Sequence, residues 1–414
     1  MSTSAPAPAS PPETAPAVEQ EHRISIGQIA RDRARSMREG DLGSLPIVIG
    51  IIVIAIYFQS RNSNFLTAAN FVNLIAQMAA VMIIGTGIVF VLLLGEIDLS
   101  VGYVSGMGGV IAALLLEPGK SIPTSVAVAL ALGTGVAIGL IQGWFVAKVG
   151  VPSFVVTLAG LLGWNGVVLL IIGSSGTIVI QNSFINGIAN SYMPSWLAWV
   201  VAVASVVAYA WQHLANFYRR RRAKLPTDPY LFLIGRIVVL AAAAIAVVVI
   251  ADSDRGLPYV SLIMLGSYVV WTFVADRTRF GRHIYGVGGN AEAARRAGID
   301  VRHIRVTAFT LCSAFGALGG VFLASTTGGV QLDLGSGNIL LFAVAAAVIG
   351  GTSLFGGRGR PRDAIIGALV ITIIPNGIGL RPSLPPSYNS IITGAVLLIA
   401  AAVDALSRRR SAAR

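Results

Sequence analysis

The sequence predicts an all-α fold, a polytopic transmembrane helical bundle, and three observations lead to that prediction. Of the 414 residues, 55% are hydrophobic and only 12% are charged, whereas a soluble globular chain carries about 25% charged residues. Apolar runs long enough for a helix of about 20 residues to cross a bilayer recur along the chain. The basic residues fall on alternate loops between these runs, which is the pattern of a membrane protein with a defined orientation.

Twelve candidate spans follow from the apolar runs and from the Gly, Pro and charged residues that interrupt them. The run at 338–353 is short and predicts a tilted or partial helix. Residues 1–43 are predicted to form a disordered, basic cytoplasmic tail, and residues 407–414 a short basic one. The transmembrane domain, 44–406, contains the spans 44–60, 72–94, 101–117, 123–147, 153–173, 195–214, 233–251, 257–275, 304–324, 338–353, 363–380 and 389–406.

The basic residues also give the orientation of the chain. With twelve spans, both tails and every second loop lie on one side of the membrane. Of the 30 Lys and Arg residues, only Arg61, Lys120, Arg255 and Arg381 fall on the other side. Because basic loops stay in the cytoplasm, both termini are predicted to be cytoplasmic. The net charge of +12 is then explained by topology, and we expect no nucleic-acid partner.

Membrane lipid is one expected partner of the basic side. Residues 24–39 within the N-terminal tail can form a short basic helix on the membrane surface, where anionic lipid would bind it. A solvated cytoplasmic tail is the alternative for the same residues.

Residues for catalysis, metal binding or energy conversion are missing from the predicted spans. The four histidines are scattered and Cys312 is the only cysteine, so we expect no metal site, no cofactor and no catalytic residues. Acidic side chains avoid the span centres, which argues against ion-coupled transport. The stretch Gly119-Lys120-Ser121 resembles the end of a phosphate loop, but Leu114 stands where that loop needs glycine. Energy for transport would therefore have to come from another chain.

A first functional candidate is the segment from Gly95 to Gly102, GEIDLSVG, between two apolar spans. Two carboxylates at a membrane boundary are costly unless they are capped, paired or hydrated. Asp98 and Ser100 could each cap the following helix. Alternatively, Glu96, Asp98 and Ser100 belong to a broken helix end that lines a translocation path or gate.

A second candidate is a short helix in the long charged loop 276–303. Asn290 is a suitable N-cap, Glu292 lies in the first turn, Arg295 in the last turn, and Gly298 provides the stop. These signals predict a two-turn helix that projects into water. It is either a structural linker or a docking element.

Two weaker patterns accompany these candidates. The Gly-rich loop 350–362 could contact a partner or lipid headgroups, or be a plain basic turn. The segments 95–102 and 329–337 both carry Asp-Leu between glycines after an apolar span, on opposite sides of the membrane, as an inverted repeat requires. Chance similarity is the alternative for that pair. Close glycine pairs such as Gly316 and Gly320 are typical of tightly packed membrane helices.

Three blocks, in this order, resemble the permease subunits of ribose- and xylose-type sugar ABC importers. They are GEIDLSVG at 95–102, TRFGRHIY with GGNAEAARRAGI at 278–299, and GGTSLFGGRGR at 350–360. The resemblance covers 60–406 and implies a translocation subunit that is not itself an enzyme. It also implies a homodimer in the bacterial inner membrane, a separate ABC ATPase subunit, and an extracytoplasmic sugar-binding protein.

The resemblance also assigns roles to residues. It implies a coupling helix that meets the ATPase. The family's simpler pattern has ten spans, and the extra two-span segment 195–251 resembles the xylose-type branch, which favours a pentose. Alternatives are a branched-chain amino-acid ABC permease, a self-sufficient secondary transporter and a structural membrane scaffold. The coupling residues are Gly289, Asn290, Glu292, Ala293, Ala294, Arg295 and Gly298.

Overall fold

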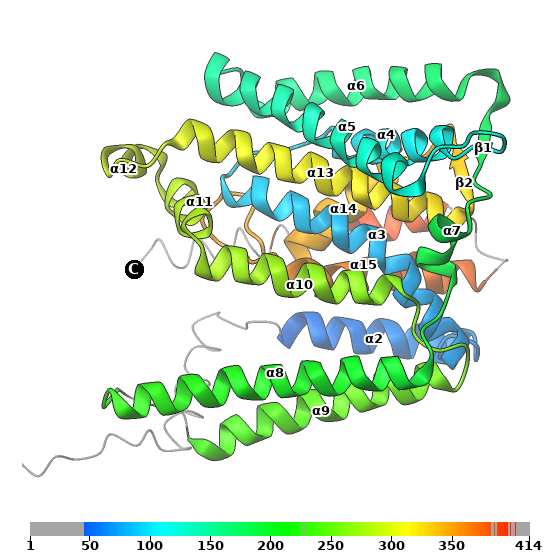
Figure 1. Cartoon of the computed structure of the whole chain (residues 1–414). Coiled ribbons are helices and arrows are strands. Elements are labelled where there is room, and N and C mark those ends of the chain that lie inside the picture. Colours follow the sequence, from blue (N-terminus) through cyan, green and yellow to red (C-terminus); the bar gives the residue numbers. More distant parts are fainter. Residues whose placement is uncertain are drawn as a thin grey trace, which may run out of the picture.

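The fold is known from a computed structural model that describes residues 45–381 apart from 226 and 228, together with 385, 387–395, 398 and 402. The described chain is a helical bundle with one small two-stranded ribbon (Figure 1). The predicted all-α polytopic bundle is therefore confirmed. The tail 1–43, its segment 24–39 and the tail 407–414 lie outside the described residues.

Apolar helices occupy the first eleven predicted spans. Seven helices in the described part of the chain are long and apolar enough to cross a membrane. The last predicted span, 389–406, is only partly described and is helical at 387–395. The helices in these spans are α2 (Leu45–Arg61), α3 (Ala68–Leu93), α4 (Val101–Leu115), α5 (Thr124–Trp144) with a π-helical continuation η1 (Phe145–Val149), α6 (Ser153–Ile172), α8 (Ser195–Arg222), α9 (Tyr230–Asp252), α10 (Val260–Arg277), α13 (Val301–Thr327), α14 (Gly337–Ile349) and α15 (Asp363–Gly379).

Shorter elements connect these helices. A 3-10 turn, η2 (Gly173–Ser175), and the helix α7 (Ser183–Asn190) follow α6, and strand β1 (Thr177–Val179) between them pairs antiparallel with β2 (Gly329–Gln331). The helices α11 (Arg279–Gly289) and α12 (Ala291–Arg296) lie between α10 and α13. They form most of the predicted loop 276–303.

The centre of the bundle is α3, which is buried along most of its length and packs against α13. Small residues allow this approach. A Cβ atom added at Gly87 on α3 would lie 2.7 Å from Phe315 Cβ, and one added at Gly109 on α4 would lie 2.9 Å from Gly320 O. Backbone contact of this kind stabilises membrane helix pairs through van der Waals packing. The packing role predicted for the close glycine pairs is thus seen directly.

Four apolar helices of the described chain, α2, α4, α14 and α15, are shorter than the seven that could cross a bilayer, and α4 and α14 are the shortest of them. The 15 residues of α4 and the 13 of α14 give lengths of about 22 Å and 20 Å at about 1.5 Å per residue, against a hydrocarbon core of about 30 Å. Their N-termini approach each other, because a Cβ atom added at Gly102 would lie 2.8 Å from Gly335 O and 3.1 Å from Leu340 Cβ. The predicted run 101–117 is helical at Val101–Leu115, and the run 338–353, which was predicted to be a tilted or partial helix, is helical at Gly337–Ile349.

Non-helical segments lead into these two short helices from opposite ends of the bundle. The segment 95–100 starts where Glu96 pairs with Arg305, near the beginning of α13. It ends beside Gly316, near the middle of that helix, where a Cβ atom would lie 3.0 Å from a methyl group of Val101. The segment 328–336 starts at the other end of α13 and contains β2. This antiparallel correspondence is the arrangement that the inverted repeat predicts.

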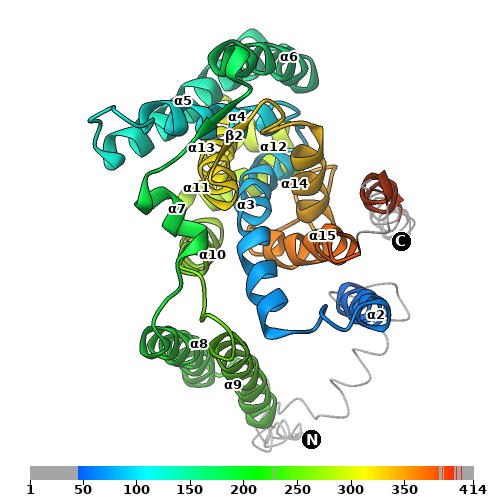
Figure 2. The ribbon, with the colours of Figure 1, turned by 90° about the vertical axis from the view of Figure 1, so that its right-hand side faces the viewer.

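The helices α8 and α9, from the extra segment 195–251, form a hairpin at the edge of the bundle (Figure 2). They pack mainly on each other. A small apolar cluster that includes Val72, Met193, Val248 and Leu257 joins them to α3 at one end only.

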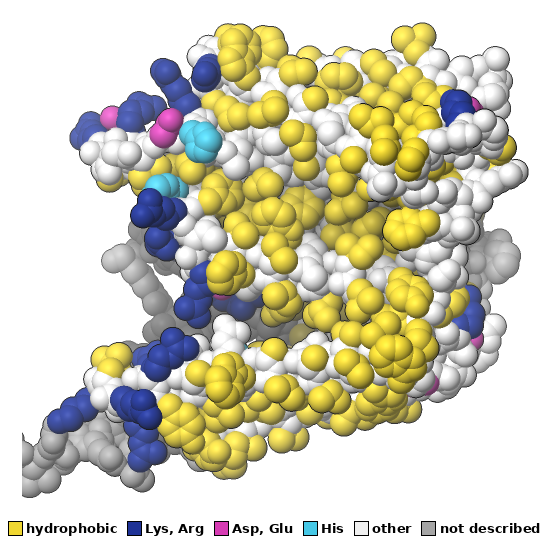
Figure 3. Space-filling view, in the orientation of Figure 1, with side chains coloured by type: hydrophobic (Ala, Val, Ile, Leu, Met, Phe, Trp, Pro, Cys, Tyr) yellow, Lys and Arg dark blue, Asp and Glu magenta, His cyan; other side chains and the backbone are white. Residues whose placement is uncertain are grey.

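Basic side chains gather at one end of the bundle, at the left of Figure 3, which we call the basic end. In the described chain this end carries Lys148 after α5 and the arginines at the ends of α8 and α10. The opposite end carries Arg61, Arg255 and Arg381. There the guanidinium of Arg255 donates a hydrogen bond to Asn73, near the start of α3. The two predicted sets of charges are therefore separated. That the basic end faces the cytoplasm stays a prediction.

Candidate functional site

The helix α12 lies at the basic end and is largely exposed, and its local sequence explains why it is a helix. Asn290 Oδ1 accepts a hydrogen bond from Ala293 N at 2.9 Å, which caps the N-terminus. At the other end, Gly298 N donates to Arg295 O and Ile299 N to Ala294 O, both at 3.0 Å, with Gly298 at φ +83°. This pair of bonds is the Schellman motif. The short helix with the predicted cap and stop is confirmed.

The surface that α12 presents is charged. Figure 1 shows the helix projecting from the left of the bundle. Glu292 pairs with Arg295 at 2.9 Å and with Arg296 at 3.3 Å, and all three side chains are more than half exposed. Exposed pairs of this kind stabilise a helix by only about 0.3–0.5 kcal/mol, so their main effect is to order the charges on the exposed face.

One of the seven predicted coupling residues differs from the others. Ala294 is buried, with 6% of its surface exposed, and packs in the main core. It attaches α12 to the bundle. The other six are exposed to solvent: Gly289, Asn290, Glu292, Ala293, Arg295 and Gly298.

Below α12, three segments that are far apart in the sequence meet through glycines. Gly357 N donates to Leu93 O at 2.9 Å. Gly288, near the end of α11, lies against both, since a Cβ atom there would overlap Leu93 O and lie 2.9 Å from Gly357 N. We call this contact the glycine junction; it comprises Gly95, Gly288, Gly356 and Gly357. The three blocks 95–102, 278–299 and 350–360 thus touch at one point, which the sequence alone did not predict.

A tyrosine on α11 makes a second connection to the loop 350–362. Tyr285 Oη donates to Gly359 O at 2.8 Å. Burial, and secondarily the nearby carboxylate of Asp276, raises the pKa of Tyr285 to about 12. The phenol therefore keeps its proton and its hydrogen bond across the neutral pH range.

Replacing Tyr285 with phenylalanine is expected to loosen the loop 350–362 without unfolding the bundle. A hydrogen bond of this kind contributes about 1 kcal/mol net, so amide hydrogen exchange at 356–359 should become roughly fivefold faster. The exposed Tyr218 on α8 supplies the control, Tyr218→Phe, which should leave this loop unchanged. Identical exchange in both variants would mean that the Tyr285 bond does not hold the loop.

The segment 95–100 is held by three neighbouring helices. Glu96 forms an ion pair with Arg305 of α13 at 3.2 Å. Ile97 N donates to Ser153 Oγ at 3.4 Å, and Thr157 Oγ1 donates to Ile97 O at 3.3 Å, both from α6. Non-helical backbone at membrane depth requires partners of this kind, because lipid offers none.

Asp98 and Ser100 form a buried polar cluster with α5. Asp98 Oδ1 accepts from Ser100 N at 2.9 Å and from Ser100 Oγ at 2.7 Å, and Gln142 Nε2 lies 2.9 Å from the same hydroxyl. Both residues are almost fully buried. In this conformation they hold the segment together and face no open path.

The capping role predicted for Ser100 is wrong. Ser100 is the N-cap residue of α4, but its side chain makes no capping bond and its backbone is helical (φ −82°, ψ −19°). A helical backbone turns the hydroxyl away from the first turn, towards Asp98 and Gln142. Asp98 instead accepts the Ser100 N–H at the positive end of the helix dipole.

Sequence reasoning missed the residues that support this segment. Gln142, Ser153 and Thr157 are buried polar residues on α5 and α6. Their polarity within apolar spans was the available signal, because such residues usually hydrogen-bond to a neighbouring helix. Among the described residues, no group of three or more His, Cys, Asp or Glu could hold a metal ion.

The bundle of long apolar helices defines the class of protein, a multi-pass membrane protein. The family model for the branched-chain amino acid transport system permease component matches residues 70–401, and the chain belongs to that family of multi-pass membrane permeases. The xylose transport system permease protein of Escherichia coli K12 is 35% identical over 369 residues, which is 88% of this chain and 92% of that protein.

Two further relatives agree with this assignment. The xylose transport system permease protein of Haemophilus influenzae is 31% identical, over 88% of this chain and 96% of that protein. The ribose import permease protein of Escherichia coli K12 is 29% identical, over 86% and 92%. No solved structure matches the chain. The resemblance to ribose- and xylose-type permeases is therefore confirmed.

Proposed function

We propose that this chain is the translocation subunit of an ATP-driven importer that carries a monosaccharide, with a pentose such as xylose favoured. Similarity to xylose permeases over most of both chains supports the substrate class. A branched-chain amino acid, which the family name mentions, is the alternative. The chain would work in the bacterial inner membrane with both termini in the cytoplasm.

Three partners belong to this proposal. An ABC ATPase subunit would bind α12, an extracytoplasmic sugar-binding protein would deliver the solute at the opposite end, and a second copy of this chain would complete the path. ATP hydrolysis would take place on the ATPase subunit. The observation that carries the proposal is the position of α12, exposed at its tip and connected by the glycine junction to 95–100.

The connection suggests how work would reach the membrane. Movement of α12 is transmitted through α11 to Gly288, which touches Leu93 and Gly357 through backbone atoms. No flexible side chain lies between these backbones to absorb the movement. The displacement would therefore pass to 95–100 and to 350–362, which lead into α4 and out of α14. A shift of these two short helices would open the translocation path first to one side of the membrane and then to the other.

Glu96, Asp98 and Ser100 have a gating role in this scheme. Their ion pair and hydrogen bonds keep the segment closed in the present conformation. Opening would exchange these bonds for bonds to water or to sugar hydroxyls, which are equally good partners for carboxylates and hydroxyls.

Reconstitution in liposomes tests the proposed function. We expect labelled xylose to accumulate only when the chain is combined with its ATPase subunit, its sugar-binding protein and ATP. Vesicles that contain the chain alone should show no uptake. Uptake by the chain alone would instead identify a secondary transporter, and uptake of leucine but not of sugars by the complete system would identify an amino-acid permease.

A further inference from the structure

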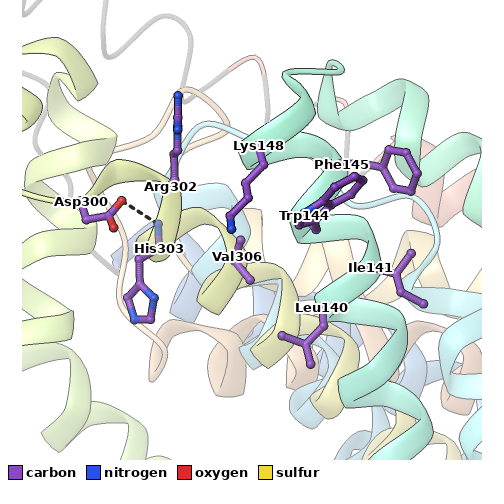
Figure 4. Close-up of a pocket in the computed structure, with 9 residues that line it drawn as sticks. All are labelled: Leu140, Ile141, Trp144, Phe145, Lys148, Asp300, Arg302, His303 and Val306. Carbon is purple, nitrogen blue, oxygen red and sulfur yellow. Dashed lines mark hydrogen bonds between the residues drawn. The ribbon is translucent and has the colours of Figure 1, made fainter.

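A groove at the basic end lies between the end of α5 with η1 and the beginning of α13. Its volume is about 820 Å³, within the range of about 300–1,000 Å³ that is usual for small-molecule sites. Figure 4 shows Lys148 extending from η1 towards α13, with Trp144 and Phe145 on the α5 side. Nothing in the proposed transport cycle uses this groove.

The groove has an apolar part and a polar part, which lie at different depths along the membrane normal. Leu140, Trp144 and Phe145 belong to a predicted span, and each is between 41% and 48% exposed, so they offer an apolar wall at the depth of the acyl chains. Lys148, Arg302 and His303 lie in the adjoining predicted loops, at the depth of the headgroups. A ligand that fills this groove needs an apolar chain and a polar head next to each other.

The polar half carries an excess of positive charge. Asp300 also lines it, but its Oδ1 accepts the His303 N–H at 3.1 Å as the N-cap of α13. Within the described residues, neither Lys148 nor Arg302 forms an ion pair with an acidic side chain. The headgroup that suits these two cations is an anion.

We propose that this groove binds an anionic phospholipid, with its phosphate between Lys148 and Arg302 and an acyl chain along Trp144 and Phe145. Basic pockets between membrane helices on the cytoplasmic side are suited to such headgroups. The π-helical turn contributes to the site, because it places Phe145 and Lys148 on the same groove.

Two other occupants fit less well. A two-fold interface uses the same patch on both subunits. A second copy bound at this groove would therefore bring its own Lys148 and Arg302 close to those of the first copy, and like charges would face each other. The apolar wall lies at acyl-chain depth, which a soluble ATPase subunit does not reach. Charge complementarity therefore favours a lipid.

Fluorescence quenching tests this proposal on the full-length chain in nanodiscs of phosphatidylcholine. Brominated acyl chains quench tryptophan on contact, and the Trp144 signal is the difference between the wild type and Trp144→Phe. We expect brominated phosphatidylglycerol at low fractions to quench Trp144, and brominated phosphatidylcholine at the same fractions to quench it much less. High salt should weaken the quenching by phosphatidylglycerol, because it screens exposed charges.

Charge removal supplies the matched comparison. In Lys148→Gln/Arg302→Gln the apparent affinity for phosphatidylglycerol should fall about 25-fold, since each cation near a membrane surface contributes about a factor of five. The control Arg277→Gln/Arg282→Gln removes two exposed cations from the same end, outside the groove, and should leave the affinity unchanged. Equal quenching by both brominated lipids in the wild type, insensitive to salt, would overturn the proposal. Loss of a dimer in the groove variant without a change in quenching would assign the groove to a second copy.

Discussion

Exchanging the charges of Glu292 and Arg295 is expected to abolish coupled uptake while the permease still folds and inserts. In Glu292→Lys/Arg295→Glu the pair between positions 292 and 295 is kept with its sign reversed, while the pair between Glu292 and Arg296 is lost. The reversal opposes the helix dipole and costs about 0.3–1 kcal/mol per charge in an exposed helix. The Asn290 cap and the buried Ala294 anchor remain in place, so the bundle itself should be unaffected.

The effect on the proposed contact between α12 and the ATPase subunit should be much larger. Juxtaposing like charges across an interface costs several kcal/mol, so a surface selected to match α12 should bind the variant poorly. We expect ATP-driven sugar uptake to fall at least about tenfold, and the ATPase activity of the assembled complex to lose its dependence on the binding protein. The measurement is uptake and ATP hydrolysis in the same proteoliposomes.

An equivalent charge pair elsewhere in the chain provides the control. Lys120 and Glu117 have the same spacing as Arg295 and Glu292 and the same separation of 2.9 Å, but they lie at the opposite end. The variant Glu117→Lys/Lys120→Glu should transport normally. If uptake also stays coupled to ATP hydrolysis in Glu292→Lys/Arg295→Glu, then α12 does not transmit the energy of ATP hydrolysis to the membrane helices.

The α12 prediction succeeded because its signals are local. Asn290 and Gly298 lie within nine positions of each other, and the cap and stop act through the backbone of the helix that they bound. The long apolar helices were also predictable, because a bilayer of fixed thickness demands runs of fixed length.

The contacts that hold the short helix α4 in place were not predictable, although its bounds, Val101–Leu115, agree closely with the predicted run 101–117. The run 101–117 is mostly apolar, and its hydropathy does not reveal which other segments it contacts. The helix is held there by the contact of Gly102 with Gly335 and by the hydrogen bonds of Ser100 to Asp98 and to Gln142. The contacts with Gly335 and Gln142 join residues tens to hundreds of positions apart, and nothing in the segment 95–102 alone specifies them.

The sequence contains the glycines of the glycine junction, but it does not show that they contact one another. Each of the three blocks contains glycines, which could equally have served turns. Only the fold shows that Gly288 is required to be glycine by a neighbour nearly two hundred positions away, Leu93. Gly356 and Gly357, by contrast, also have positive φ values of +85° and +71° and would need glycine in any context.

Replacing Gly288 with alanine is therefore expected to damage both stability and transport. The added Cβ atom would overlap Leu93 O, and its nearest neighbours are all backbone atoms, which cannot rotate away as a side chain can. Overpacking of this kind typically costs about 1–3 kcal/mol. We expect a lower melting temperature in detergent and sugar uptake reduced several-fold, because α11 must move away from both α3 and 350–362.

A second glycine of the same helix separates this effect from a general loss of backbone freedom. A Cβ atom at Gly286 would meet only the tip of Ile299, at 3.7 Å, so Gly286→Ala should keep normal stability and uptake. Equal behaviour of the two variants would show that the Gly288 contact is not tight. If Gly288→Ala alone lost uptake but kept normal stability, the result would have a different meaning. The substitution would then act only on the transmission of movement from α12 to 95–100.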